Sequence, residues 1–311
     1  MSNYGESIFE ITNAQEANIL NLTLCTFEGN VASDSLIRST SLSISQNSVA
    51  YLFNQGRLLY GFEMSSMETE IYIENHQCLE TNDEGCIKYL ESGSIQMANF
   101  NVNSLKSNLI LDSIVGINAI FSIDNLTLAN IETTSSFSLF YMINCSLTIQ
   151  NTDLGGLNKN IIFMNSFSSL FIFNSTFSEL ISEFVEITSF FECVNCQRLI
   201  IQNVVVKECS TIIGTCFSFS LGNFSFHSKK INISGSLNSS NYLIKDNIFM
   251  DCQNIEGGVF LIIDQNVQLL NNSFLYNNAS SGGALHFECP SKPNCNWNLT
   301  SNFCKKNQFY K

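Results

Sequence analysis

The 311-residue chain has few charges, almost no proline and no long apolar run, and each scarcity excludes a class of protein. Charged residues make up 13% of the chain, with 14 basic against 27 acidic side chains and a formal net charge of −13. A surface without a basic stripe cannot displace counterions from a phosphate backbone, so nucleic acid is excluded as a main partner. Two prolines and 16 glycines exclude collagen-like and proline-rich linker sequences.

Neither a membrane helix nor a secretory signal can be recognised in the sequence. No segment approaches the roughly 18 consecutive apolar residues that a membrane helix needs. Residues 1–15 lack the basic start and the apolar centre of a signal peptide. The chain stops directly after a patterned segment, and we therefore expect it to be an excerpt of a longer protein that is anchored by sequence outside it.

The abundant residues are apolar ones, asparagine and serine. Apolar side chains make up 45% of the chain and the mean hydropathy is +0.11, which is enough to build a core. The 40 asparagines and 42 serines form about a quarter of the chain. They must supply most of the polar surface, because ionised side chains are scarce.

One short pattern recurs along the whole chain. Two apolar residues alternate with other residues, an asparagine follows two positions later, and a further apolar residue follows three positions after that. Three more copies carry Gln46, Asp246 or Ser301 at this anchor position, and successive anchors lie 20 to 30 residues apart. The asparagine anchors are Asn21, Asn75, Asn99, Asn125, Asn151, Asn174, Asn203, Asn223 and Asn271.

The repeat predicts short strands rather than helices. Apolar residues alternate with period two before each anchor, and a second apolar run follows each anchor. A period near 25 residues with two or three short strands is typical of a parallel β-helix, in which each coil pairs with the coils before and after it. We therefore expect an all-β fold in which residues 1–311 form one single-stranded parallel β-helix, a solenoid of about twelve coils.

Asparagine suits a corner of such a solenoid for two reasons. It tolerates the left-handed backbone conformation of a sharp turn, and its amide can donate and accept hydrogen bonds along a stack of identical positions. We therefore expect the nine asparagine anchors to form a structural ladder.

Twelve cysteines and ten Asn-x-Ser/Thr sequons indicate an oxidising, extracellular compartment. Cys78 and Cys86 bracket one polar insertion and Cys289 and Cys295 bracket another, so we expect disulfides to close two loop insertions, at 78–86 and 289–295. The candidate glycosylation sites are Asn21, Asn125, Asn144, Asn174, Asn223, Asn232, Asn238, Asn271, Asn278 and Asn298.

Cys193 and Cys196 form a C-x-x-C and are a third candidate disulfide pair. Together with Cys209 and Cys216 they leave a four-thiolate zinc site as an alternative, although the spacing differs from that of paired C-x-x-C modules. We predict disulfides or stacked core cysteines here, and neither a metal nor another cofactor.

Two motifs near the C-terminus point to a family. Residues 274–277 read F-L-Y-N and residues 282–285 read G-G-A-L; a weaker copy lies at 249–259, and F-x-x-N recurs at 27–30. This pairing resembles the F-x-x-N and G-G-A-[ILV] repeats of the polymorphic outer-membrane protein family, which also occur in large surface proteins of protists. The resemblance implies a right-handed β-helix of the pectate-lyase type, displayed at a cell surface and used in adhesion or as a stalk.

A glycan-cleaving β-helix is the enzyme class to be weighed. Asn151, Thr152 and Asp153 spell an N-T-D that resembles one element of the polygalacturonase signature, in which carboxylates supply acid and base. Its companions are missing, because the chain has no Asp-Asp pair, no Gly-His-Gly and no Arg-Ile-Lys. We therefore predict no catalytic residue.

The sequence thus favours a non-catalytic structural or adhesive element at a cell surface or outside the cell. Its expected partners are surface glycans or other surface proteins, with membrane contact only through sequence outside the chain. The alternative is a β-helix that binds or cleaves carbohydrate, which would place carboxylates, aromatic rings and a basic residue on neighbouring coils. A third interpretation, an intracellular asparagine-rich scaffold, predicts free thiols at Cys78, Cys86, Cys289 and Cys295.

Overall fold

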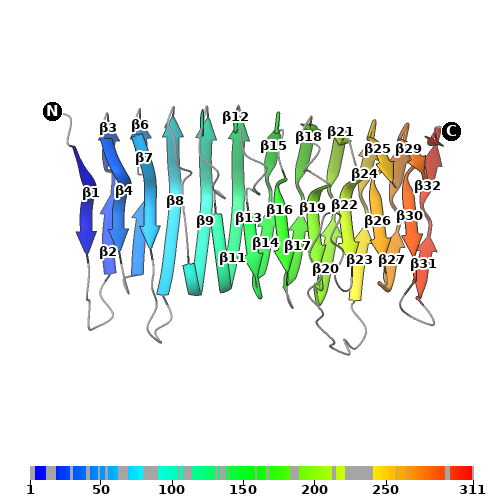
Figure 1. The fold of residues 1–311 in the computed structure, drawn as a ribbon, viewed down its shortest axis with the longest axis horizontal. Coiled ribbons are helices and arrows are strands. Elements are labelled where there is room, and N and C mark those ends of the chain that lie inside the picture. Colours follow the sequence, from blue (N-terminus) through cyan, green and yellow to red (C-terminus); the bar gives the residue numbers. More distant parts are fainter. Residues whose placement is uncertain are drawn as a thin grey trace.

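The computed structural model is an elongated stack of β-strands with the two termini at opposite ends (Figure 1). Its side chains are described at 21–28 and in most segments from residue 120 onward. The described residues contain no helix, and hence none long and apolar enough to cross a membrane. The residues that the structure describes are 4–11, 19–28, 31–39, 43–47, 50–52, 55–61, 69–79, 90–103, 106–107, 114–129, 132–133, 138, 140–157, 160–165, 168–182, 189–211, 215–220, 241–256, 258–263, 265–290 and 295–309.

Eleven strands pair one after another along the first face of the stack. Each of these pairings is parallel, so equivalent residues of successive coils lie directly opposite one another. The strands are β2 (Ile19–Thr23), β5 (Ser43–Asn47), β8 (Thr69–Leu79), β9 (Leu90–Asn103), β11 (Ile114–Ala129), β14 (Ser146–Gln150), β17 (Ser169–Phe173), β20 (Arg198–Gln202), β23 (Asn241–Lys245), β27 (Val267–Leu270) and β31 (Trp297–Thr300).

Two further sets of strands complete the coils. The residues after the first corner form the ends of β8, β9 and β11 together with β3 (Thr26–Glu28), β6 (Ala50–Leu52), β15 (Asp153–Gly155), β18 (Thr176–Ser182), β21 (Val205–Thr211), β24 (Ile248–Met250), β25 (Gln253–Glu256), β28 (Ser273–Leu275), β29 (Asn278–Ser281), β32 (Phe303–Lys305) and β33 (Gln308–Phe309). The third set is β13 (Phe140–Ile143), β16 (Ile162–Asn165), β19 (Ser189–Val194), β22 (Thr215–Ser220), β26 (Phe260–Ile263) and β30 (Leu285–Glu288). Smaller pairings join β1 (Tyr4–Ile11), β4 (Val31–Ser39) and β7 (Gln55–Gly61), and β10 (Lys106–Ser107) with β12 (Glu132–Thr133).

The predicted all-β solenoid of parallel strands is confirmed, while its right-handedness stays a prediction. The number of coils differs from the prediction of twelve. β20 pairs directly with β23, with Leu199 opposite Tyr242, so no strand of the first face lies between them. Asn223, the predicted anchor between these strands, falls outside the described residues.

Like residues stack on like residues in the core because the pairing is in register. Five fully buried isoleucines follow one another on successive coils: Ile123, Ile149, Ile172, Ile201 and Ile244. The intervening side chains of the same strands are partly exposed, which is the alternation that the sequence pattern predicted.

Phenylalanines fill the wider part of the core. The rings of Phe191 and Phe217 stack with their centroids 4.4 Å apart, and Phe217 stacks on Phe260 at 4.8 Å. Phe249 stacks on Phe274 at 5.3 Å. Each such pair contributes about 0.5–1.5 kcal/mol beyond the burial of its area, so the aromatic column binds each coil to the next.

The corner after the first face has a left-handed backbone. Asn125, Asn151, Asn174, Asn203 and Asn271 have φ between 47° and 55°, and Asp246 has φ of 57°. Asn75 and Asn99 belong to the same column, because Ala98 pairs with both Glu74 and Asp124, but their side chains lie outside the described residues. Asparagine and aspartate accept this conformation more readily than other side chains, which explains their recurrence.

Four exposed corner amides form rungs of such a ladder within the described residues. Each of the four donates from Nδ2 to the coil before it, Asn174 to Asn151 Oδ1 at 3.4 Å and Asn203 to Asn174 Oδ1 at 3.1 Å. Two carboxylates are also acceptors: Asp124 for Asn151 at 2.8 Å and Asp246 for Asn271 at 2.7 Å. These contacts satisfy polar groups at a turn where backbone hydrogen bonds within the coil are missing.

The prediction for Asn21 is wrong. Asn21 lies inside β2 opposite Ser45, and the left-handed residue of this coil is Leu24, three positions later, with φ of 54°. A second apolar alternation, Leu20 and Leu22, runs in the opposite phase to Ala17 and Ile19, so the template matched three residues ahead of the corner.

A second set of asparagines points inward. Asn247 and Asn272, both 1% exposed, follow the corner residues Asp246 and Asn271, and Asn302 is the next in line. Asn247 Nδ2 donates to Asn272 Oδ1 at 2.8 Å, and Asn272 Nδ2 donates to Asn302 Oδ1 at 2.9 Å. Each Oδ1 also accepts from the backbone N–H of the coil before it. A column of amides, fully buried at Asn247 and Asn272, thus pairs with itself from coil to coil.

The F-x-x-N and G-G-A motifs have a direct structural explanation. Phe274 belongs to the aromatic column, and Asn277 Nδ2 donates to Asn307 Oδ1 at 3.0 Å in a further inward ladder. Gly258 lies against Gly283, where a Cβ would come within 2.0 Å of the Gly283 carbonyl oxygen. The asparagine pairs coils, and the glycine allows their backbones to approach.

The inward ladder gives the first test. Replacing Asn272 by alanine removes the acceptor for two donors of Asn247 and the donor to Ile244 O, which leaves buried polar groups unpaired. We expect the free energy of unfolding to fall by about 3 kcal/mol, measured by urea denaturation. Asn271→Gly is the matched control: glycine suits φ of 54° and only an exposed bond is lost, so its cost stays within about 1 kcal/mol. Equal losses in the two variants would contradict the assigned role of the inward amides.

Candidate functional site

Three disulfides occur within the described residues, and two of them join predicted pairs. Cys193 bonds to Cys196 at the end of β19, and Cys289 bonds to Cys295 in the connection between β30 and β31. Cys78 lies within strand β8 rather than in a loop, and Cys86 falls outside the described residues, so this predicted pair is not tested.

The third disulfide joins Cys209 to Cys216. With Cys193 bonded to Cys196, the four sulfurs that the sequence had left open for zinc are consumed in two separate bonds. Cys209 is near the end of β21 and Cys216 near the start of β22, so this bond closes the turn between two strands of one coil.

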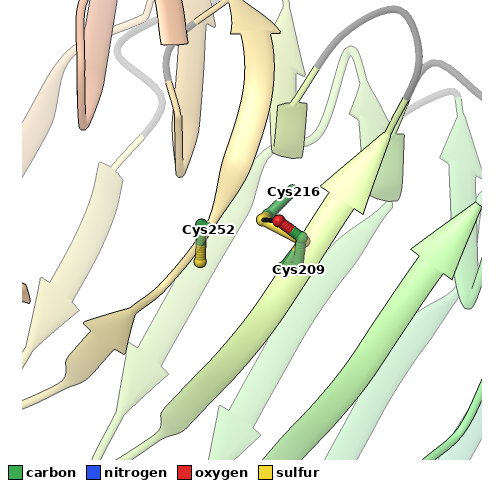
Figure 2. A group of neighbouring side chains, drawn as sticks. All are labelled: Cys209, Cys216 and Cys252. Atoms are coloured by element: carbon green, nitrogen blue, oxygen red, sulfur yellow. Dashed lines mark hydrogen bonds between the residues drawn. A yellow bond between two sulfur atoms is a disulfide. The ribbon is translucent and has the colours of Figure 1, made fainter. Parts of the chain in front are cut away.

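A free thiol lies beside this disulfide (Figure 2). Cys252, at the start of the connection into β25, has its Sγ within 4.8 Å of the sulfurs of Cys209 and Cys216. All three side chains are fully buried. We call Cys209, Cys216 and Cys252 the cysteine trio.

A buried amide orders the surroundings of the trio. Asn254 Oδ1 accepts from the backbone N–H and the hydroxyl of Thr211, at 2.9 and 2.8 Å. Its Nδ2 donates to the Gly258 carbonyl and to Cys216 Sγ, the latter at 3.4 Å. The amide thereby fixes the turn that carries Cys216 relative to the coil that carries Cys252.

Burial keeps the Cys252 thiol protonated. Loss of solvent raises its pKa to about 12, a backbone hydrogen bond from Cys209 opposes the rise, and the neighbouring Asp251 carboxylate adds to it. Thiolates, not thiols, bind metals. Holding a cation here would require reducing the disulfide and ionising three sulfurs in an apolar interior, so the arrangement fits a thiol next to a disulfide rather than a metal centre.

A second arrangement lies on the surface, at the second corner of the coils. Glu179, Glu208, Asp251, Tyr276 and Lys306 occupy one position on five successive coils, as the pairing of their neighbours shows. All five are described with a left-handed φ between 51° and 57°. We call this column the corner strip.

The corner strip combines three kinds of side chain. Glu179, Glu208 and Asp251 are exposed carboxylates on adjacent coils, and Tyr276 is 40% exposed beside them. The ammonium groups of Lys305 and Lys306 lie 5.7 and 5.9 Å from the centre of the Tyr276 ring. Carboxylates, an aromatic face and basic groups therefore follow one another along the rod, about 4.8 Å apart.

The N-T-D element does not form part of such a strip. Asn151 is a ladder residue, and the buried Thr152 donates its hydroxyl to the Gln150 carbonyl at 3.0 Å. Asp153 is exposed, but its register neighbours are Thr127 and Thr176, so no carboxylate lies opposite it on either adjacent coil. All three residues therefore have structural explanations.

The sequons differ in how their amides are engaged. Asn174 and Asn271 donate from Nδ2 within the outer ladder, whereas Asn298 is exposed and accepts at Oδ1 from its own sequon hydroxyl, Thr300, at 2.9 Å. Asn21, Asn125 and Asn144 are exposed as well, and Asn278 is partly exposed. Asn223, Asn232 and Asn238 lie outside the described residues.

Sequence reasoning missed three groups: Cys252, the inward asparagines and the corner strip. A usable signal for the inward asparagines was present, because Asn247, Asn272 and Asn302 each follow an anchor directly. Cys252 occupies the place of asparagine in the weaker F-x-x-N copy, so it marked a stacked inward position. The corner strip had no signal of its own, because its members share a position but not a residue type.

Searches of protein-family models, curated proteins and solved structures found no match to this chain.

The buried Cys252 thiol makes stability depend on pH. Its pKa is raised in the fold, so the unfolded chain releases the proton near pH 9 while the folded chain keeps it up to about pH 12. The stabilisation is complete below pH 9, and the free energy of unfolding falls above it by about 1.4 kcal/mol per pH unit. Urea denaturation at pH 8, 9 and 10 should show this slope and its reduction in Cys252→Ala.

Cys304→Ala serves as the control, because Cys304 is an exposed free thiol. It should reduce the slope less than Cys252→Ala does. Tyr242, whose pKa burial also raises, adds to the loss only above pH 10. An unchanged slope in Cys252→Ala would contradict the assignment.

Proposed function

We propose that the chain is a non-catalytic structural rod of an extracellular or cell-surface protein. The observation that carries this is the in-register column of eleven paired strands, in which stacked core side chains and asparagine rungs join successive coils. Such a stack transmits load along its axis through hydrogen bonds and packed rings. At about 4.8 Å per coil its eleven strands span roughly 50 Å.

Disulfides and sequons support the extracellular placement. Structural disulfides persist in oxidising compartments, and the Cys289–Cys295 bond closes the connection between β30 and β31. The resemblance of residues 274–285 to repeats of surface proteins points the same way. We propose cell-surface glycans or neighbouring surface proteins as contacts of the rod, and attachment to a membrane through sequence outside it.

The extracellular location is tested on the protein isolated from its own cells. We expect a glycan on Asn298, because its side chain is exposed and its Nδ2 makes no hydrogen bond to the described residues. Enzymatic release of N-glycans should convert Asn298 to aspartate in peptide mass spectra, while Asn296, exposed but outside a sequon, stays unchanged. Cys289 and Cys295 should appear bonded. An unmodified Asn298 together with free thiols at both cysteines would overturn the extracellular proposal in favour of an intracellular scaffold.

The corner strip supports a second candidate, binding of polysaccharide along one edge of the rod. Aromatic faces pack on sugar rings, and carboxylates accept hydrogen bonds from sugar hydroxyls. The repeat of coils presents these groups at regular intervals to an extended ligand. This candidate adds a partner to the structural role and requires no catalytic step.

Affinity electrophoresis on gels that contain neutral or acidic polysaccharides tests this candidate. Retardation should be lost in Tyr276→Ala, with binding weakened at least tenfold, because the one exposed ring of the strip is removed. Tyr141→Ala is the matched control, since this partly exposed tyrosine stacks on Phe163 at the third set of strands. Equal retardation of all three proteins would contradict binding at the corner strip and leave the structural role alone.

A further inference from the structure

The strand register brings a disulfide and a thiol from successive coils together. Ser210 pairs with Gln253, which places Cys209 opposite Cys252 on neighbouring strands. Adjacent strands lie about 4.8 Å apart, within the Cα separation of roughly 4.4–6.8 Å that a disulfide spans. Because all sulfurs of the cysteine trio lie within 4.8 Å of one another, Cys209 faces two alternative bonding partners.

We propose that the cysteine trio undergoes internal thiol–disulfide exchange, converting the Cys209–Cys216 bond into a Cys209–Cys252 bond. The Cys252 thiol loses its proton, and its sulfur attacks Cys209 Sγ. The Cys209–Cys216 bond breaks, and the Cys216 sulfur leaves with the electron pair and takes up a proton. One disulfide and one thiol are present before and after, so no oxidant or reductant is consumed.

The exchange changes what the disulfide holds together. The Cys209–Cys216 bond links residues seven apart within one coil and crosses no coil boundary. A Cys209–Cys252 bond would join two successive coils covalently and enclose the segment that contains residues 221–240. Backbone hydrogen bonds and packed rings between these coils separate under axial load, whereas a disulfide does not. The trio is therefore a latent lock between the two coils that the β20–β23 pairing joins.

The environment of the trio makes the conversion slow at neutral pH. The Cys252 thiol is fully buried, and the neighbouring Asp251 carboxylate disfavours its ionisation further. Burial, the Cys209 backbone hydrogen bond and Asp251 govern its ionisation, and no basic side chain among the described residues contributes. The rate should rise as pH increases, because the attacking species is the thiolate. Thiol–disulfide exchange does not depend on the cellular location or the partners of the rod, so its test is independent of the test of the proposed function.

Disulfide mapping of the folded protein tests the exchange. The protein is incubated without added thiol at pH 7 and at pH 9, quenched with acid, alkylated, and digested under acidic non-reducing conditions. We expect a Cys209–Cys252 cross-linked peptide with alkylated Cys216, at least fivefold more abundant after the same time at pH 9. A Cys209–Cys216 linkage alone at both pH values, with Cys252 alkylated, would count against the exchange in the intact protein.

A variant tests directly whether the Cys209–Cys252 bond is compatible with the fold. Cys216→Ser leaves only Cys209 and Cys252 of the trio, and refolding in a glutathione buffer supplies oxidised glutathione as the oxidant, which is reduced to two thiols. We expect the Cys209–Cys252 bond in most molecules that elute as folded monomer. Cys216→Ser with Cys304→Ser should keep this bond, and Cys216→Ser with Cys252→Ser should leave Cys209 free. Folded Cys216→Ser with both thiols unbonded, together with an unexchanged wild type, would overturn the proposal.

Discussion

The structure depends on one constraint, the in-register parallel pairing of each coil with the next. Equivalent residues then lie directly above one another at about 4.8 Å, and a side chain must be compatible with a near copy of itself on both sides. Isoleucine, phenylalanine and asparagine meet this condition in different ways. The first two pack against their equivalents, while asparagine has both a donor and an acceptor and can pair with itself. The same constraint disfavours stacked like charges, which agrees with the low charge of the whole chain; the three stacked carboxylates of the corner strip are exposed to solvent.

The fold could be predicted from the sequence because the spacing of equivalent residues in the repeat indicates which residues of successive coils pair. Period-two alternation indicated strands, and the regular spacing of the anchors indicated coils; residues such as Ile149, Ile172 and Ile201 lie where this pattern places them. The number of coils could not be predicted in the same way. Asn223 matches the template, but the pairing of β20 with β23 depends on which strand is nearest in space, and the sequence of 221–240 does not contain that information. The prediction for Asn21 failed for a different reason: two apolar alternations in opposite phase overlap at 17–22, and the template matched the one ahead of the true corner at Leu24.

The candidate sites were less predictable, because they depend on stacking between residues far apart in the sequence. Cys209 and Cys252 become neighbours only through the direct pairing of β20 with β23 and of Ser210 with Gln253, which joins residues 43 apart in the sequence. A spacing rule based on one coil would have paired Cys209 with other residues. The corner strip likewise emerges from five positions with different side chains, so neither composition nor motif could have drawn attention to Tyr276 or Glu208. Local disulfides such as Cys193–Cys196 and Cys289–Cys295 could be predicted from the sequence, because only a few residues separate the two cysteines of each pair.

The two asparagine ladders have opposite polarity. In the exposed ladder each Nδ2 points to an oxygen of the coil nearer the N-terminus, as from Asn203 to Asn174. In the buried ladder the amide-to-amide bonds run toward the C-terminus, as from Asn247 to Asn272 and onward to Asn302. Aligned amides in a single ladder would add their dipoles along the axis, as peptide groups do in a helix. The two ladders are described together between the coils of Asp246 and Asn271, where their bonds point in opposite directions along the axis, so the amide dipoles offset one another at this step.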